Sequence, residues 1–303
     1  MPSYATCHIF AATVQRVTSD AVAHIIDSAP SAYRWGAQGV SPLRMYHHAP
    51  LPSPLHHAAA ELRTQPPARL FEALCRAACA AHNTAALAYV FGFCTNYALS
   101  RVTSRFIDEQ ADRLATYMPG LSAAARRQLA ASDIDGIMIE DYIDTASAGY
   151  AAYRLLDADA PECTAAARVL AQAVHATLGT HVSPAAVYRG MHDMRHILRL
   201  AHGGAPVRSR LQKLEHLLGR SGMASSFIRP AEPLAADCAN REHRPWQSTN
   251  GERTESFGDL FDAAVPLAVS LQRAVLDRYF QDKPLDPRFF PSDFNGNSVK
   301  NGK

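Results

Sequence analysis

Apolar positions recur along most of the chain with the three-to-four-residue spacing that places them on one face of an α-helix. This spacing predicts helices over residues 11–27, 68–82, 85–118, 122–131, 137–156, 164–178, 183–201, 208–218 and 256–280. Ser183 and Pro184 combine a capping hydroxyl with a proline in the first turn, which is typical of a helix start. No stretch of useful length alternates with a two-residue period, so we expect an all-α, multi-helix protein with essentially no sheet.

Polar residues interrupt the most apolar of these segments in a regular way. Residues 87–106, LAYVFGFCTNYALSRVTSRF, are nearly all apolar, yet Asn96, Ser100 and Ser104 follow one another at i, i+4 spacing. They therefore share one face of one helix. Because a buried hydroxyl or amide without a partner costs on the order of 1–3 kcal/mol, we expect this polar row to line an internal site.

The same segment carries a family resemblance. GFCTNYALSRVTSRFI resembles the signature G-F-x-x-H-Y-x-L-D-x-x-x-H-x-Y-I of the zinc-dependent phospholipase C family. The resemblance implies an all-helical fold of the three-zinc hydrolase type. Asn96, Ser100 and Ser104 stand where the family has His, Asp and His. Since neutral amides and hydroxyls are poor zinc ligands, the fold signature is present without this part of the metal site.

Further segments resemble motifs of the same family, in the order in which the family has them along the chain. TCHIF resembles T-H-x-x-F and places Cys7 at a ligand histidine, while AYRWGAQGVSPLRMYHH resembles the turn G-x-Q-G-P-D-x-x-x-Y and places Ser41 at a ligand aspartate. ELRTQPPARLFEAL resembles M-H-x-x-P-x-x-x-F-F and places Arg63 at a ligand histidine. TASAGYAAYRLLD resembles H-x-x-x-E-x-x-x-D-R and gives Thr145 for the histidine and Gly149 for the glutamate.

Only one of the substituted positions could bind zinc, through the thiolate of Cys7. The full set reads Cys7, Ser41, Arg63, Asn96, Ser100, Ser104, Thr145 and Gly149. A catalytic zinc site needs several anionic or imidazole ligands and an open position for an activated water. The resemblance therefore implies a pseudoenzyme, a phospholipase C-like helical domain over residues 1–292 with no zinc and no other cofactor.

The function that these residues favour is non-catalytic binding or interaction, including metal-free binding of a small anion. Arg63 could grip a phosphate- or carboxylate-bearing ligand bidentately at a position where the family holds metal charge. Two alternatives stay open. The pocket could run metal-free or single-metal chemistry, for instance with Cys7 as an activated thiolate. A phosphodiester hydrolase of the phospholipase C type would instead require that three of a set of histidines converge on one point: His8, His24, His175, His192 and His196.

Other clusters of His and Cys have plainer interpretations. His192 and His196 lie at i, i+4, a spacing that can chelate a metal, but we interpret them as part of a half-exposed helix face. Cys75, Cys79 and His82 fall in the small-residue stretch CRAACAAH, where cysteine packs as a compact apolar residue. Two histidine pairs flank a proline-rich loop over residues 44–57 and are interpreted as solvated: His47, His48, His56 and His57.

Composition and charge limit the classes of binding partner that the sequence indicates. The net charge is only +2 and no long basic run occurs, so neither a nucleic acid nor an anionic membrane surface is indicated. The longest apolar run, residues 87–94, is too short to span a bilayer. No export signal begins the chain, and six irregularly spaced cysteines are typical of reduced thiols, so we expect a cytoplasmic protein. The polar stretch 293–303 predicts a disordered tail, and no feature specifies a protein partner.

Overall fold

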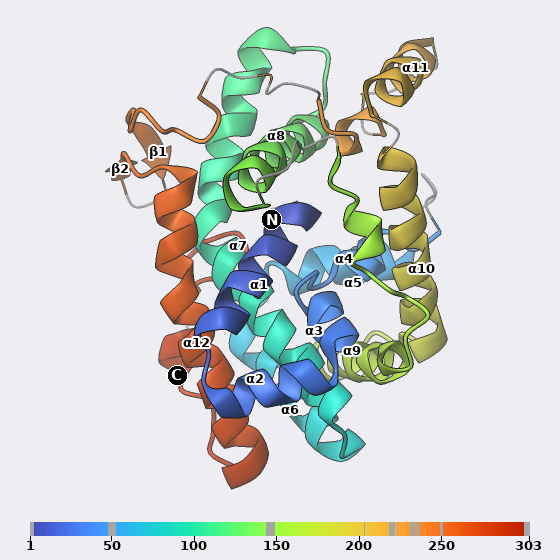
Figure 1. The fold of residues 1–303 in the computed structure, drawn as a ribbon, viewed down its shortest axis with the longest axis vertical. Helices are drawn as coiled ribbons and strands as arrows, with labels where there is room; N and C mark the ends of the chain where they lie inside the picture. Colours follow the sequence, from blue (N-terminus) through green and yellow to red (C-terminus); the bar gives the residue numbers. More distant parts are fainter. Residues whose placement is uncertain are drawn as a thin grey trace.

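The computed structural model describes residues 3–47, 53–143, 149–202, 204–217, 222, 224–230, 234, 237–248 and 251–299. Within these ranges the chain is mostly helical, with a single pair of three-residue strands (Figure 1). The all-α class expected from the periodicity is confirmed. None of the helices in these ranges combines the length and apolar character that a bilayer crossing requires.

The helices differ widely in length. Their bounds are α1 Tyr4–Val17, α2 Asp20–Ser28, α3 Pro30–Gly36, α4 Ser41–Arg44, α5 Pro54–Leu62, α6 Pro67–Ala81, α7 Thr84–Tyr117, α8 Ala123–Ile143, α9 Glu162–Leu178, α10 Pro184–Ala201, α11 Gly204–Leu217 and α12 Phe257–Gln281. Short 3₁₀ turns are η2 Ala152–Arg154, η3 Ser225–Phe227 and η4 Pro287–Phe289. Strands β1 Trp246–Ser248 and β2 Gly251–Arg253 pair antiparallel.

Helix α7 is the long central element of the fold. It runs through the middle of the molecule and contacts α3, α12, α8, α2, α1, α6 and α9 (Figure 1). Asn83 caps its start, because the side-chain oxygen accepts a hydrogen bond from the Ala86 amide at 2.8 Å. Most of its residues from Ala86 to Leu114 are buried, so we expect most polar side chains along this stretch to find hydrogen-bond partners inside the protein.

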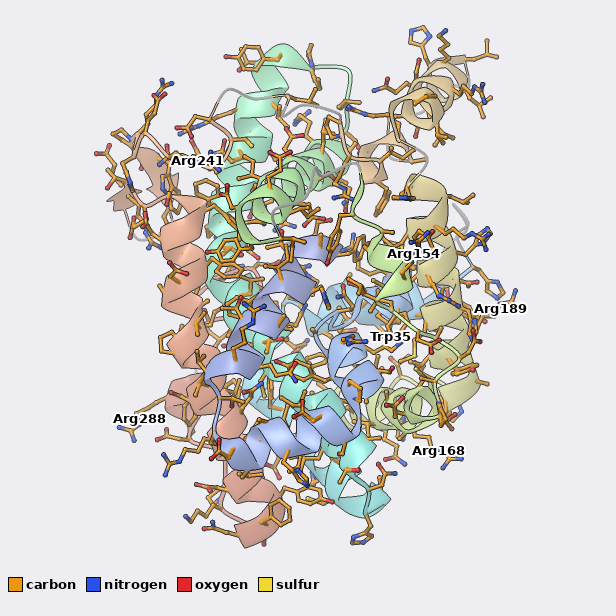
Figure 2. All side chains as sticks on the ribbon, in the orientation of Figure 1. Trp35, Arg154, Arg168, Arg189, Arg241 and Arg288 are labelled. Carbon is orange, nitrogen blue, oxygen red and sulfur yellow. The ribbon has the colours of Figure 1, made fainter. Side chains whose placement is uncertain are left out.

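Two glycines allow α3 to cross α7 in close contact. A Cβ atom at Gly36 would lie 2.0 Å from the Tyr89 carbonyl oxygen, and one at Gly92 would lie 2.0 Å from the Tyr33 carbonyl oxygen. Both helices therefore approach backbone to backbone, which no larger residue permits. Trp35 on α3 is fully buried, and its indole nitrogen donates to the Asp157 carbonyl at 3.0 Å (Figure 2).

Several predicted helix boundaries differ from the structure. The helix predicted over residues 11–27 is two helices, α1 and α2, because Thr18 and Ser19 adopt extended backbone conformations between them. The segments 122–131 and 137–156 are instead the continuous α8 and the short η2. The helices α3, α4 and α5 were not predicted, since four to nine residues are too few to establish a helical period.

The predicted disordered tail is wrong for residues 293–299. Phe294 is only 2% exposed, and its ring packs edge-on against Tyr97 at 5.0 Å between centroids. Asp293 orders the turn that follows, because its Oδ1 accepts from the amides of Asn295 and Asn297, both at 2.8 Å. Residues 292–299, hereafter the C-terminal strap, thus lie against α7. Residues 300–303 fall outside the described ranges.

Candidate functional site

The polar row on α7 lies inside the protein, as the sequence predicts. Asn96 is 2% exposed, and Ser100 and Ser104 are fully buried. The Asn96 side-chain nitrogen donates to the Ala37 carbonyl at 2.9 Å, and the Ser104 hydroxyl donates to the Phe294 carbonyl at 2.9 Å. The two ends of the row therefore hold two different segments, the turn after α3 and the C-terminal strap.

The turn after α3 brings further polar groups to the row. Gly39 has φ +56°, and a Cβ atom there would lie 2.3 Å from the Asn96 side-chain oxygen, so both conformation and space require glycine. Gln38 and Ser41 flank this contact and are buried. Within the described ranges, both polar atoms of the Gln38 amide and the hydroxyls of Ser41 and Ser100 have no hydrogen-bond partner. Native proteins contain few buried polar groups without a hydrogen-bond partner.

Arg63 follows the last residue of α5 and is only 9% exposed. Its Nη2 donates to the Asn295 side-chain oxygen of the strap at 2.6 Å, and no carboxylate of the described chain lies within ion-pair distance of it. Burial lowers the pKa of Arg63 to about 9, assisted by the nearby cations Arg127 and Arg44. The side chain remains charged at neutral pH, in a place where a positive charge is poorly solvated.

Cys7 on α1 is close to the same row. Its sulfur lies 3.8 Å from the Asn96 side-chain nitrogen. Burial, and next the charge of Asp135, raise the pKa of Cys7 to about 12, outweighing the opposite effects of Asn96 and Arg63. The thiol is therefore protonated at neutral pH, which opposes the role of an activated nucleophile.

We call Cys7, Ser41, Arg63, Asn96, Ser100 and Ser104 the substituted site. Contacts link four of these residues: Cys7 lies against Asn96, and Arg63 and Ser104 are joined through Phe294 of the strap. Ser41 comes two residues after Gly39, which contacts Asn96, and Ser100 lies between Asn96 and Ser104 on α7. The other two predicted positions are not brought to it. Gly149 is exposed, and Thr145 lies outside the described residues.

The residues present do not fit zinc. The substituted site offers one thiol, one guanidinium, one neutral amide and three hydroxyls, which are not a zinc-binding set. In the part of the chain that the structure describes, no three His, Cys, Asp or Glu side chains are grouped to hold a metal ion. The convergence of histidines that an active hydrolase would need is therefore not seen there.

The His and Cys clusters have ordinary surroundings. His192 lies 3.6 Å from an Asp159 carboxylate oxygen, and its ring packs against Tyr188. Cys75 is buried in the core, while His82 is exposed at the left-handed C-cap of α6. His48, from one of the two histidine pairs of the proline-rich loop, lies outside the described ranges.

A second buried polar cluster was missed by sequence reasoning. Asp135 on α8 is 4% exposed and caps the start of α1, accepting from the amides of Ala5 at 3.2 Å and Thr6 at 2.8 Å. Burial raises the pKa of Asp135. A cavity of about 30 Å³ adjoins it, lined also by Tyr150, whose buried hydroxyl has no partner within the described chain, and by Arg229. The position of Asp135 inside the apolar segment IDGIMI is the sequence feature that indicates a buried carboxylate.

Comparison of the chain with protein families, with curated proteins and with solved structures finds no match. The fold and the site together define an all-α protein with a buried polar centre on its longest helix. Among the described residues, the cation of this centre, Arg63, is bonded to a neutral amide rather than to a carboxylate.

Proposed function

We propose that this chain is a phospholipase C-like protein whose metal site has been dismantled, and that it acts as a non-catalytic binder of small anions at the substituted site. Two features support the family part of the proposal: the order of the motifs along the sequence, and the contacts that join four of their ligand positions, Cys7 with Asn96, and Arg63 with Ser104 through the strap. The donor set opposes zinc chemistry, and the protonated Cys7 opposes nucleophilic chemistry.

One observation carries the anion-binding part: Arg63 is buried without a carboxylate partner in the described chain. Buried charges in proteins are normally paired, because an isolated charge loses its hydration. A phosphate or carboxylate at the guanidinium would restore that pairing through two parallel hydrogen bonds. The cations Arg44 and Arg127, which lower the pKa of Arg63, would add favourable charge for the same anion, whereas the carboxylates of Asp108 and Asp293 act in the opposite sense.

The neutral groups nearby suit an anion as well. The hydroxyls of Ser41 and Ser100 and the amide nitrogen of Gln38 are buried donors without partners in the described chain. Asn295 at present accepts from Arg63 with a neutral amide oxygen. A charged oxygen makes a stronger bond to a guanidinium than a neutral one does, so an anion would compete with the strap for Arg63.

The test is the melting temperature of the purified chain during titration with inorganic phosphate, and separately with acetate. A ligand that binds only the folded state stabilises it by RT ln(1 + [L]/Kd), about 2.7 kcal/mol at a hundredfold excess over Kd. We expect a saturable rise that Arg63→Ala abolishes and that the matched control, the exposed Arg76→Ala on α6, retains. Asn295→Ala, which removes the competing oxygen, should move the titration to lower anion concentration.

A complementary variant is Asn96→Leu, which removes an amide from the site and keeps a side chain of similar size. It should weaken the anion response, and because it also removes the donor to the Ala37 carbonyl, its melting temperature without anion should lie below that of wild type. If millimolar anions leave the wild-type melting temperature unchanged, or raise it equally in wild type and Arg63→Ala, the chain does not bind anions at Arg63 and the proposal fails.

A further inference from the structure

A groove of about 350 Å³ lies between α7, α12 and η4. Its walls are mostly apolar: Tyr97 and Ala98 on α7, Leu267 and Leu271 on α12, and Phe289 of η4. Leu267 and Leu271 are one turn apart and so present one continuous edge. This volume lies within the range of small-molecule sites, which are typically apolar with a few fixed polar groups.

Arg101 supplies a charge in the wall of this groove. Its Nη1 donates to the Phe289 carbonyl at 2.8 Å, and the guanidinium lies 5.8 Å from the centroid of the Tyr97 ring. Within the described chain no carboxylate is within ion-pair distance of it. Two other arginines of these helices do have such partners: Arg113 on α7 lies 3.4 Å from Glu109, and Arg278 on α12 lies 2.8 Å from Glu72.

The carboxylate in the groove wall, Asp286, is already paired. It accepts from the Arg288 amide at 2.9 Å and from the Arg288 guanidinium at 2.7 Å. Arg288 is exposed beside the lower part of α12 and extends away from the body of the protein (Figure 2). Among the described residues that line the groove, Arg101 is therefore the uncompensated charge, fixed in place by its bond to a backbone carbonyl.

We propose that this groove binds a single-chain aliphatic carboxylic acid, with the carboxylate at Arg101 and the hydrocarbon chain along Leu267 and Leu271. The apolar walls favour the chain because burying it removes apolar surface from water. The guanidinium carries five N–H donors, so it has donors left for a carboxylate beyond those used by the Phe289 carbonyl and the Tyr97 hydroxyl. One cation and an elongated apolar wall match one negative charge on an apolar tail. This site is separate from the substituted site, because Arg63 takes no part in it.

Isothermal titration calorimetry with three probes of equal chain length tests the proposal: octanoate below its micelle concentration, octanol and octyltrimethylammonium. Octanoate should bind saturably with one equivalent, and at least about tenfold more tightly than the neutral or cationic probe. Arg101→Met keeps most of the length of the side chain but removes its charge, and should reduce octanoate affinity by about tenfold or more. The exposed Arg76→Met serves as the matched control and should bind as wild type does.

A second variant protects the test against a folding defect in Arg101→Met. Ser270 is exposed and lines the groove, so Ser270→Phe fills it without changing the core, and should also abolish octanoate binding. Arg63→Ala should leave octanoate binding intact, which separates this inference from the anion site. Equal affinity for the three probes, or unchanged octanoate binding in Arg101→Met and Ser270→Phe, would overturn it.

Discussion

The buried polar residues of α7 differ in whether the rest of the protein gives them a hydrogen-bond partner. Asn96 and Ser104 each donate to a backbone carbonyl of another segment, whereas the Ser100 hydroxyl between them has no partner in the described chain. The three residues look equivalent in the sequence, since they occupy one face at equal spacing. Their contributions to folding should nevertheless differ in sign.

Ser104→Ala should destabilise the protein by about 1–3 kcal/mol, because it leaves the buried Phe294 carbonyl without its donor. Ser100→Ala should be neutral or slightly stabilising, because it removes a hydroxyl that is desolvated without compensation. Urea unfolding of the two variants gives the comparison directly. A larger loss for Ser100→Ala than for Ser104→Ala would mean that Ser100 has a partner, such as an ordered water, and would contradict this account.

His8 on α1 makes stability depend on pH. Burial, and next the charge of Arg34, lower the pKa of His8 to about 4 in the folded state, whereas an unfolded histidine titrates near 6.5. Between these values the unfolded chain binds the extra proton, so the free energy of unfolding should fall as pH drops from about 6.5 towards 4, by no more than about 3 kcal/mol.

Denaturant unfolding measured across this pH window tests the effect. His8→Gln should flatten the dependence, while the exposed His82→Gln should leave it unchanged. The same slope in wild type and His8→Gln would show that another group is responsible.

At the scale of elements, the crossing of α3 and α7 leaves no room for a side chain. Gly92→Ala would place a methyl group 2.0 Å from the Tyr33 carbonyl oxygen, so the two helices must move apart. We expect a loss of about 3 kcal/mol or more, or failure to fold, because backbone atoms cannot relax as side chains do.

The matched control is Gly258→Ala in the first turn of α12. Its Cβ would meet only the Ser256 hydroxyl oxygen at 3.6 Å, an ordinary contact, so the substitution should stabilise the protein by about 0.5–1 kcal/mol through the reduced entropy of the unfolded chain. Thermal unfolding of both variants is the measurement. Comparable stability for the two would show that the crossing is looser than the distances indicate.

The long helices could be predicted because many periods of apolar residues fix both their type and their extent. The cores of α6, α7, α9, α10 and α12 agree with the sequence to within a few residues. The break between α1 and α2 was missed although Ser19 precedes Asp20 in a typical capping pattern. When the apolar spacing is helical on both sides of a short extended turn, the spacing alone predicts one continuous helix. Only the capping residue Ser19 indicates that a second helix begins there.

Only the part of the candidate site that lies on one helix could be predicted from the sequence. The polar row on α7 follows from spacing within one helix, but its partners Phe294 and Asn295 lie far away in the sequence. Their segment is rich in Asn, Gly and Ser, a composition that indicates disorder when taken alone. It is ordered here because Phe294 enters the aromatic core and Asp293 closes the turn. Neither the burial of Phe294 nor the turn at Asp293 can be predicted from the composition of the segment alone.

For the whole molecule, the donor set predicts the metal content and the activity. Purified protein should carry less than one equivalent of zinc, because no three potential metal ligands are grouped in the described chain. It should also not hydrolyse phosphatidylcholine or chromogenic phosphodiesters above background with or without added zinc, since this chemistry requires a metal-activated water. Elemental analysis and a turnover assay are the measurements. Two or more zinc ions per chain, or zinc-dependent turnover that is lost in Cys7→Ala, would contradict the proposal that the metal site has been dismantled.

The bond between Arg63 and Asn295 also has a kinetic consequence. It joins residues 232 positions apart, so the loop that it closes spans most of the chain and its closure is entropically unfavourable early in folding. We therefore expect the strap to dock after α7 has formed, so that Asn295→Ala accelerates unfolding while leaving the refolding rate nearly unchanged. Stopped-flow refolding and unfolding give both rates. The strap amides should likewise exchange with deuterium ahead of those in α7, through local opening that leaves the helices intact.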